Sequence, residues 1–155
     1  MNIYRIALFG HRDLYTFRDI EEKLSALMYD ILKTKDFIEI YIGRNGDFDT
    51  IASSVIRRVR DDIGYDNTEM ILVLPYLLKD TAYYEDIYDS VFIPEELSGV
   101  HPKAAITKRN RYMINRCDLC ICYVDHEFGG AYTALKYAQK QHKPIVNLAL
   151  DTIDD

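Results

Sequence analysis

The chain contains no tryptophan, only three cysteines and four prolines, and no apolar run near the length of a transmembrane helix. A bilayer span needs about 20 consecutive apolar residues, so we expect no membrane-spanning segment. The stretch at positions 1–10, MNIYRIALFG, is too short and too soon followed by charged residues for a secretory signal. We therefore expect a cytoplasmic protein that does not associate with membranes.

The few cysteines crowd into positions 117–122, at Cys117, Cys120 and Cys122. Cys120 and Cys122 are two residues apart on a predicted strand, where their side chains share a face at poor disulfide spacing. The Cys117-x-x-Cys120 pair has no second pair beside it, and no histidine stands at a regular ligand spacing. Buried thiols behave as small hydrophobic groups, so we predict reduced cysteines, no metal and no cofactor.

Positive charge is also in short supply, because 19 lysines and arginines face 25 aspartates and glutamates, for a net charge of −6. This balance argues against general nucleic-acid binding and against an anionic membrane surface. A small anionic ligand held by local arginines stays compatible with it. With 48% apolar residues, the 155-residue chain is expected to fold as one domain over residues 1–150, followed by a frayed tail at 151–155.

Apolar strands alternate with amphipathic helices along the whole chain. The helix after the first strand is predicted to begin with Thr16 as its capping residue and to bury a stripe from Phe17 to Ile31. Alternation of this kind predicts a single Rossmann-like three-layer α/β domain with about five mainly parallel strands and helices on both faces. The expected strands cover residues 3–9, 37–42, 70–74, 119–124 and 144–148, with a short additional strand near 90–93.

Three glycine-bearing turns follow predicted strands, at Gly10, at Gly43–Gly46 and at Gly129-Gly130. The carboxyl ends of parallel strands meet at one rim, which is where open α/β sheets bind ligands. A glycine turn that opens a helix offers free backbone N–H groups to an anion. The candidate ligand-binding residues are Gly10, His11, Arg12, Gly43, Arg44, Asn45, Gly46, Asp47, Arg109, Asn110, Gly129, Gly130 and Thr133.

Each candidate also has a purely structural interpretation. Gly129-Gly130 and Thr133 suit a tight turn and a capped helix, and Asp47 or Asp49 suits a helix cap. Arg109 falls on the buried stripe of the helix predicted over 102–116, where a guanidinium needs an anionic partner; a ligand phosphate suits it. Arg111, two residues on, is expected on another face, paired with surface acids such as Glu95 or Glu96.

Residues 76–101 have no clear periodicity and are rich in tyrosine. A long irregular connection inside a compact domain is usually functional. Tyrosine rings suit both base stacking and protein interfaces. This segment is therefore expected to be either a lid over the rim or a surface through which copies of the chain associate.

Five segments in this order resemble the SLOG superfamily, the Rossmann-like relatives of the DprA-type and lonely-guy proteins, and in particular its small bacterial and phage branch. They are GHRD at 10–13, IGRNGDFD at 42–49, VLPY at 73–76, AITKRNRYMINRCDLCICYV at 105–124 and GGAYTALKYA at 129–138. The resemblance covers nearly the whole chain. It implies a Rossmann-like fold with a nucleotide or nucleotide-derived ligand at the rim.

One departure bears on catalysis. Lonely-guy enzymes carry a Gly-Gly-x-Gly-Thr-x-x-Glu pattern with a catalytic glutamate, and the matching positions here hold Tyr132 for the third glycine and Lys136 for the glutamate. Glycosidic cleavage needs a carboxylate near the anomeric carbon, which lysine cannot supply. The favoured function is a binding module or sensor for a nucleotide-derived ligand. The alternatives are a nucleotide hydrolase or phosphoribohydrolase that uses other acids, and an interaction protein without a ligand.

Overall fold

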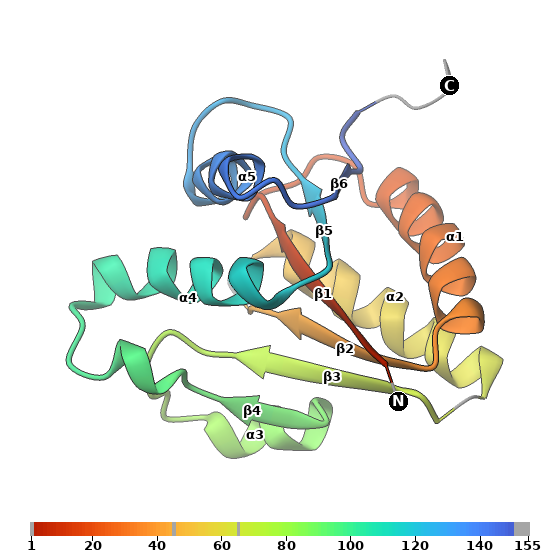
Figure 1. The fold of residues 1–155 in the computed structure, drawn as a ribbon, viewed down its shortest axis with the longest axis horizontal. Coiled ribbons are helices and arrows are strands. Elements are labelled where there is room, and N and C mark those ends of the chain that lie inside the picture. Colours follow the sequence, from red (N-terminus) through yellow and green to blue (C-terminus); the bar gives the residue numbers. More distant parts are fainter. Residues whose placement is uncertain (1, 45, 65, 151–155) are drawn as a thin grey trace.

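The computed structural model describes residues 2–44, 46–64 and 66–150 of the chain. Six parallel strands form one sheet in the order β4-β3-β2-β1-β5-β6, so the prediction of an α/β fold is confirmed, with six strands where about five were expected (Figure 1). The strands are β1 (Ile3–Gly10), β2 (Phe37–Ile42), β3 (Thr68–Val73), β4 (Ser90–Phe92), β5 (Leu119–Tyr123) and β6 (Ile145–Asn147). The helices are α1 (Arg18–Thr34), α2 (Asp47–Ile63), α3 (Thr81–Ile87), α4 (Pro102–Arg116) and α5 (Gly130–Lys140), with a 3-10 turn, η1 (Glu95–Leu97).

The central strand β1 shows why the sheet is covered on both faces. Its residues Ile6 and Leu8 pack into one core with the apolar stripes of α1 and α2, whereas Ala7 and Phe9 pack into a second core with α4 and α5. Successive strand residues point to opposite faces, so the unbroken apolar run Ile6–Phe9 has to be covered on both faces of the sheet. The helices accordingly lie in two layers, one on each side of the sheet (Figure 1).

Two expectations about helix starts are wrong. Helix α1 begins at Arg18 with Phe17 at its cap and no side-chain cap, so Thr16 does not cap it, and the Phe17 side chain is 47% exposed instead of buried. Helix α2 begins at Asp47 itself, and the residue at its N-cap position is Gly46, so Asp47 and Asp49 lie inside the first turn and neither is the N-cap residue. Asp47 and Asp49 instead place negative charge in the first turn, at the positive end of the helix dipole.

The tyrosine-rich segment 76–101 is more regular than its sequence indicates. It folds into α3, β4 and η1, and β4 pairs in parallel with β3 to extend the sheet at its edge. Tyr88 is buried against the core between α1, α2 and the sheet, while Tyr83 stays exposed. The expected tail at 151–155 lies outside the described residues. Among the residues that the structure describes, no helix is long and apolar enough to cross a bilayer.

The order of the strands places a topological switch beside β1. From β1 the chain adds β2, β3 and β4 on one side, then crosses back to add β5 and β6 on the other. The loops that leave β1 and β5 therefore diverge at the carboxyl ends of these two neighbouring strands. A crevice at this point is the usual ligand site of an open parallel sheet.

Candidate functional site

A cleft of about 630 Å³ opens at this switch point. Eight of the predicted residues line it, contributed by the loop after β1, the end of β2, α4 and the start of α5. Such a volume suits a small ligand of nucleotide size. The eight residues are Gly10, His11, Arg12, Gly43, Arg109, Asn110, Gly129 and Gly130. That they contact a ligand stays a prediction.

Four of the other predicted residues have local roles outside the lining of this cleft. The Asp47 carboxylate accepts a hydrogen bond from the Leu14 backbone N–H at 3.0 Å, and the Asp47 N–H donates to the Arg12 carbonyl at 2.8 Å. Gly46 lies against the backbone of Arg12. These contacts make Asp47 a support of the β1–α1 loop, because it holds the segment that carries Arg12.

Arg44 and Thr133 also turn to protein partners. The Arg44 guanidinium lies 5.7 Å from the centre of the Tyr84 ring. The Thr133 hydroxyl donates to the Gly129 carbonyl at 3.1 Å, one turn back along its own helix. Thr133 borders a smaller hollow of about 10 Å³ between α4 and α5. The last predicted residue, Asn45, lies outside the described residues.

Two of the glycines are explained by close packing. A Cβ added to Gly10 would lie 2.4 Å from Cγ of the buried Phe48 ring, and one added to Gly43 would lie 2.8 Å from Nη1 of Arg109. Both distances are far below ordinary carbon contacts. Gly10 thus lets α2 pack against β1, and Gly43 makes room for the Arg109 guanidinium at the floor of the cleft.

Arg109 is buried, with 3% of its surface exposed, as its place in the helical stripe predicts. Its Nη1 donates to the Val73 carbonyl at 2.9 Å and its Nε to the Asn110 side-chain oxygen at 2.9 Å. Burial lowers the pKa of Arg109, while the nearby Asp49 carboxylate opposes that shift. The guanidinium is therefore fixed at the end of β3 by neutral oxygens, facing a cleft that Asp49 also lines.

Arg111 points elsewhere, as expected from its two-residue offset. Its guanidinium lies 4.9 Å from the centre of the Tyr137 ring, which belongs to α5. The expected ion pair with η1 instead joins Arg116 to Glu96, at 3.7 Å. Of the two arginines, Arg109 alone lines the cleft.

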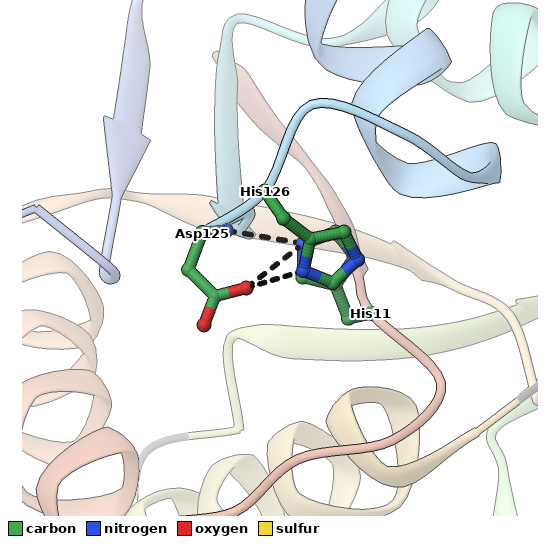
Figure 2. Close-up of side chains that lie close together, drawn as sticks. All are labelled: His11, Asp125 and His126. Atoms are coloured by element: carbon green, nitrogen blue, oxygen red, sulfur yellow. Dashed lines mark hydrogen bonds and ion pairs between the residues drawn. The ribbon is translucent and has the colours of Figure 1, made fainter.

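His11 and the β5–α5 loop are bound to each other (Figure 2). The His11 Nε2 accepts a hydrogen bond from the Asp125 backbone N–H at 3.0 Å, and the His11 ring stacks on His126 with centroids 3.5 Å apart and planes 6° from parallel. An accepting Nε2 places the single proton on Nδ1, which makes this imidazole neutral. Burial lowers the pKa of His11, His126 lowers it further, and Asp125 acts in the opposite direction.

The ligand atoms of His11, Asp125 and His126 all lie within 4.8 Å of one another, so the trio has to be considered as a metal site. The Asp125 carboxylate oxygen is 2.7 Å from Nδ1 of His126 and 3.3 Å from Nε2 of His11. A metal ion lies close to the plane of an imidazole that binds it, about 2.0–2.1 Å from the nitrogen. One ion cannot lie in two nearly parallel planes separated by a ring stack (Figure 2). The geometry suits a hydrogen-bonded stack, and the prediction of no metal stays a prediction.

None of the three cysteines is among the residues that line this cleft. Cys117 precedes β5, so it lies toward the amino end of that strand, and its Sγ is 3.4 Å from Sγ of Cys120. All three thiols are free and buried, which agrees with their expected role as small core groups. Burial raises the pKa of Cys122 to about 12.

A second hollow, of about 690 Å³, lies at the amino ends of the strands. Its walls carry two basic residues, Arg5 and Lys35, and two acidic residues, Asp36 and Asp118. Arg5 is also paired with Glu39 at 2.8 Å, and the Lys35 ammonium lies 4.4 Å from the centre of the Tyr4 ring. Open parallel sheets bind ligands at the opposite rim, where loops and helix N-termini gather. We therefore place the candidate site in the cleft at the carboxyl ends.

Sequence reasoning missed several residues of the cleft. Tyr15 and Phe128 line it from the loops after β1 and β5, and their side chains are 99% and 69% exposed. His126 is part of the lining and of the stack on His11, and it is not among the predicted ligand-binding residues. The available signal was position: segment 125–128 lies between a strand end and a glycine pair at the predicted rim.

Fold and cleft together define a Rossmann-like α/β protein with a ligand-sized site at its topological switch point. No protein-family model matches the chain, and no curated protein matches it either. The solved structures of similar fold include two DNA processing proteins. DNA processing protein A (DprA) from Streptococcus pneumoniae aligns with a TM-score of 0.69 and 16% identity over 98% of this chain. DprA from Helicobacter pylori, in a structure titled for its single-stranded DNA binding mode, aligns with a TM-score of 0.64 and 19% identity over 92%.

The chain spans 52% and 63% of the length of these two DprA chains. At such low identity the likeness establishes a shared fold. It also corrects one prediction: the argument from net charge against general nucleic-acid binding was wrong, because the DprA of Helicobacter pylori, which shares this fold, binds single-stranded DNA. A net charge of −6 describes the whole surface, whereas a single strand can be held by a local groove.

Proposed function

We propose that this chain is a binding module for a phosphorylated nucleotide, held in the cleft at the carboxyl ends of β1, β2 and β5. The observation that carries the proposal is the buried Arg109 guanidinium at the floor of the same cleft that the N-terminus of α5 enters through Gly129 and Gly130. A fixed guanidinium and free helix N–H groups are complementary to a phosphate. The resemblance to the SLOG superfamily supports this proposal through the order of its motifs.

The charge of the lining supports a ligand of mixed polarity. Arg12 and Arg109 supply two positive charges there, and Asp13 and Asp49 supply two negative ones. This local balance is less negative than the chain as a whole. A nucleotide offers a phosphate to the arginines and ribose hydroxyls as donors to carboxylates.

Binding is favoured over glycosidic cleavage. Lys136, at the position of the lonely-guy glutamate, is exposed, and its ammonium lies 5.9 Å from the centre of the Tyr132 ring. We expect AMP to raise the melting temperature of the protein without release of adenine, as followed by chromatography. Release of adenine that is abolished in Asp49→Asn, a change in the cleft lining, but retained in Asp19→Asn, a change outside the lining, would favour the hydrolase alternative instead.

A second candidate ligand is single-stranded DNA, favoured by the fold shared with the DprA of Helicobacter pylori. With two lining arginines, neutralisation of about two phosphates predicts a slope near −1.4 in a plot of log affinity against log salt concentration. Fluorescence anisotropy of a labelled oligonucleotide over a range of salt concentrations measures this slope. A much steeper slope would place binding on a larger basic surface and not in the cleft.

A further inference from the structure

We propose that the exposed ring of Phe128 is a stacking platform for an unpaired nucleobase, which extends the site from a phosphate subsite to one that recognises a whole nucleotide. This inference rests on the proposed function. It starts from the aromatic column of three rings in which Phe128 is the outermost: His11 stacks on His126 at 3.5 Å, and His126 lies 4.1 Å from Phe128 with planes 35° apart. The column runs from a buried ring at the end of β1 to a ring that is 69% exposed.

The loop that carries Phe128 is held at its start by residues from both strands beside β5, namely His11 after β1 and Asn147 in β6. The Asp125 N–H is held by His11, and the Val124 N–H and carbonyl are both bound by the side-chain amide of Asn147, each at 3.0 Å. A ring presented by an anchored loop needs little ordering when a ligand binds. An apolar ring fixed in solvent at the mouth of a cleft is therefore suited to cover a flat, apolar face of a ligand.

The neighbouring groups indicate which flat ligand fits. Phe128 directly precedes Gly129-Gly130, so a base on its ring would place the attached sugar phosphate toward the start of α5 and Arg109. Tyr15 lines the opposite loop of the same cleft and offers a second exposed ring. Nucleobases stack on aromatic side chains with little dependence on base identity. In duplex DNA both faces of each base are covered, so the platform selects free nucleotides and single strands.

The first experiment compares AMP with ribose 5-phosphate by calorimetry, in the wild type and in Phe128→Ala. Stacking of one base corresponds to about 5- to 150-fold in affinity. We expect AMP to bind more tightly than ribose 5-phosphate by this factor in the wild type. In Phe128→Ala the advantage should vanish, while the affinity for ribose 5-phosphate stays the same. The matched control is Tyr83→Ala, an exposed aromatic residue on α3 outside the cleft lining, which should leave both affinities unchanged.

The outcomes separate the two proposals. Equal affinities for AMP and ribose 5-phosphate in the wild type would overturn the platform and leave the phosphate site standing. Binding of neither compound, nor of an oligonucleotide, would overturn the proposed function together with the platform. A Phe128→Ala protein that keeps the full advantage of AMP would also overturn the role of Phe128.

A second experiment identifies the source of the base. The chain has no tryptophan, so Phe128→Trp creates a single fluorescent reporter at the proposed platform, and Tyr83→Trp gives the matched reporter elsewhere. We expect quenching at position 128, and none at position 83, on addition of AMP or of a ten-nucleotide deoxyadenosine strand. The same strand in a duplex should bind at least about tenfold more weakly. Quenching by AMP alone assigns a free nucleotide, quenching by the strand alone assigns single-stranded DNA, and equal binding of duplex and single strand would overturn the proposal.

Discussion

Replacement of Gly10 by alanine tests whether this rim residue serves packing or ligand approach. The added Cβ would lie 2.4 Å from Cγ of Phe48 and 2.7 Å from its Cβ and Cδ2, whereas ordinary contact begins near 3.4 Å. The ring would have to recede by about 1 Å, the difference between these distances, yet Phe48 is fully buried in the first turn of α2. Overpacking of this kind costs about 1–3 kcal/mol.

A smaller opposing term comes from the unfolded chain. Alanine restricts it more than glycine does, which stabilises the fold by about 0.4–1 kcal/mol where the backbone is compatible. The overpacking cost less this gain spans about 0–2.6 kcal/mol, and we expect Gly10→Ala to lose about 1–2 kcal/mol, the middle of that range. For a domain of this size, that corresponds to a fall of about 2–8 °C in melting temperature, measured by calorimetry without ligand.

Gly130→Ala is the matched control, since it lines the same cleft and a Cβ there would meet no atom within 4 Å. It should be as stable as the wild type or slightly more stable. In a double-mutant cycle, Phe48→Ala removes the Cγ and Cδ2 contacts and should reduce the cost of Gly10→Ala by at least about 0.5 kcal/mol. A Gly10→Ala protein as stable as Gly130→Ala, with weakened ligand binding only, would refute the packing argument.

Three further predictions follow from buried polar and titratable groups. Arg109→Ala should lower the affinity for AMP about tenfold to a hundredfold. It should also lower the melting temperature without ligand, because the buried Val73 carbonyl loses its donor. The control Arg111→Ala, whose guanidinium lies on the Tyr137 ring, should change neither quantity, and an Arg109→Ala protein that is more stable than the wild type without ligand would contradict the structural role of Arg109. The pKa of His11 is lowered in the fold, so its contribution to stability is present above the ordinary histidine pKa of about 6.5 and is lost as the pH falls through the folded value. His11→Gln keeps a hydrogen-bond acceptor but cannot titrate, so urea unfolding should show a smaller loss of stability on acidification for this variant than for the wild type. Equal losses in the two proteins would count against a neutral His11 imidazole. Burial raises the pKa of Cys122 from 9.0 to about 12, so its contribution to stability is present below pH 9 and is lost as the pH rises towards 12. Urea unfolding of Cys122→Ala should therefore show a smaller loss of stability between pH 9 and 12 than unfolding of the wild type. Alkylation of Cys122 in the folded protein at pH 8 would contradict its burial.

The class of fold and the location of the rim can both be predicted from the amino-acid sequence alone. The strands β1, β2 and β5 were predicted within one residue of their observed bounds, because an unbroken apolar run bounded by glycine or charge has few alternatives. Gly64 ends α2 in the left-handed conformation that glycine favours, a stop signal that can be read from the sequence. Parallel strands share one carboxyl rim, so the convergence of three glycine turns followed from topology alone.

The contacts of the rim residues, in contrast, become known only from the folded structure. His11 and His126 are 115 positions apart in the chain, and Arg109 meets a carbonyl 36 positions away, so no local pattern links them. The same holds for Phe48 against Gly10 and for the pairing of β4 with the sheet edge. Hydrophobic periodicity and capping residues reflect only the interactions of a segment with itself and with the surrounding water. Contacts between distant segments depend on the register of the sheet and on side-chain volumes across the core, which are settled only when the whole chain packs.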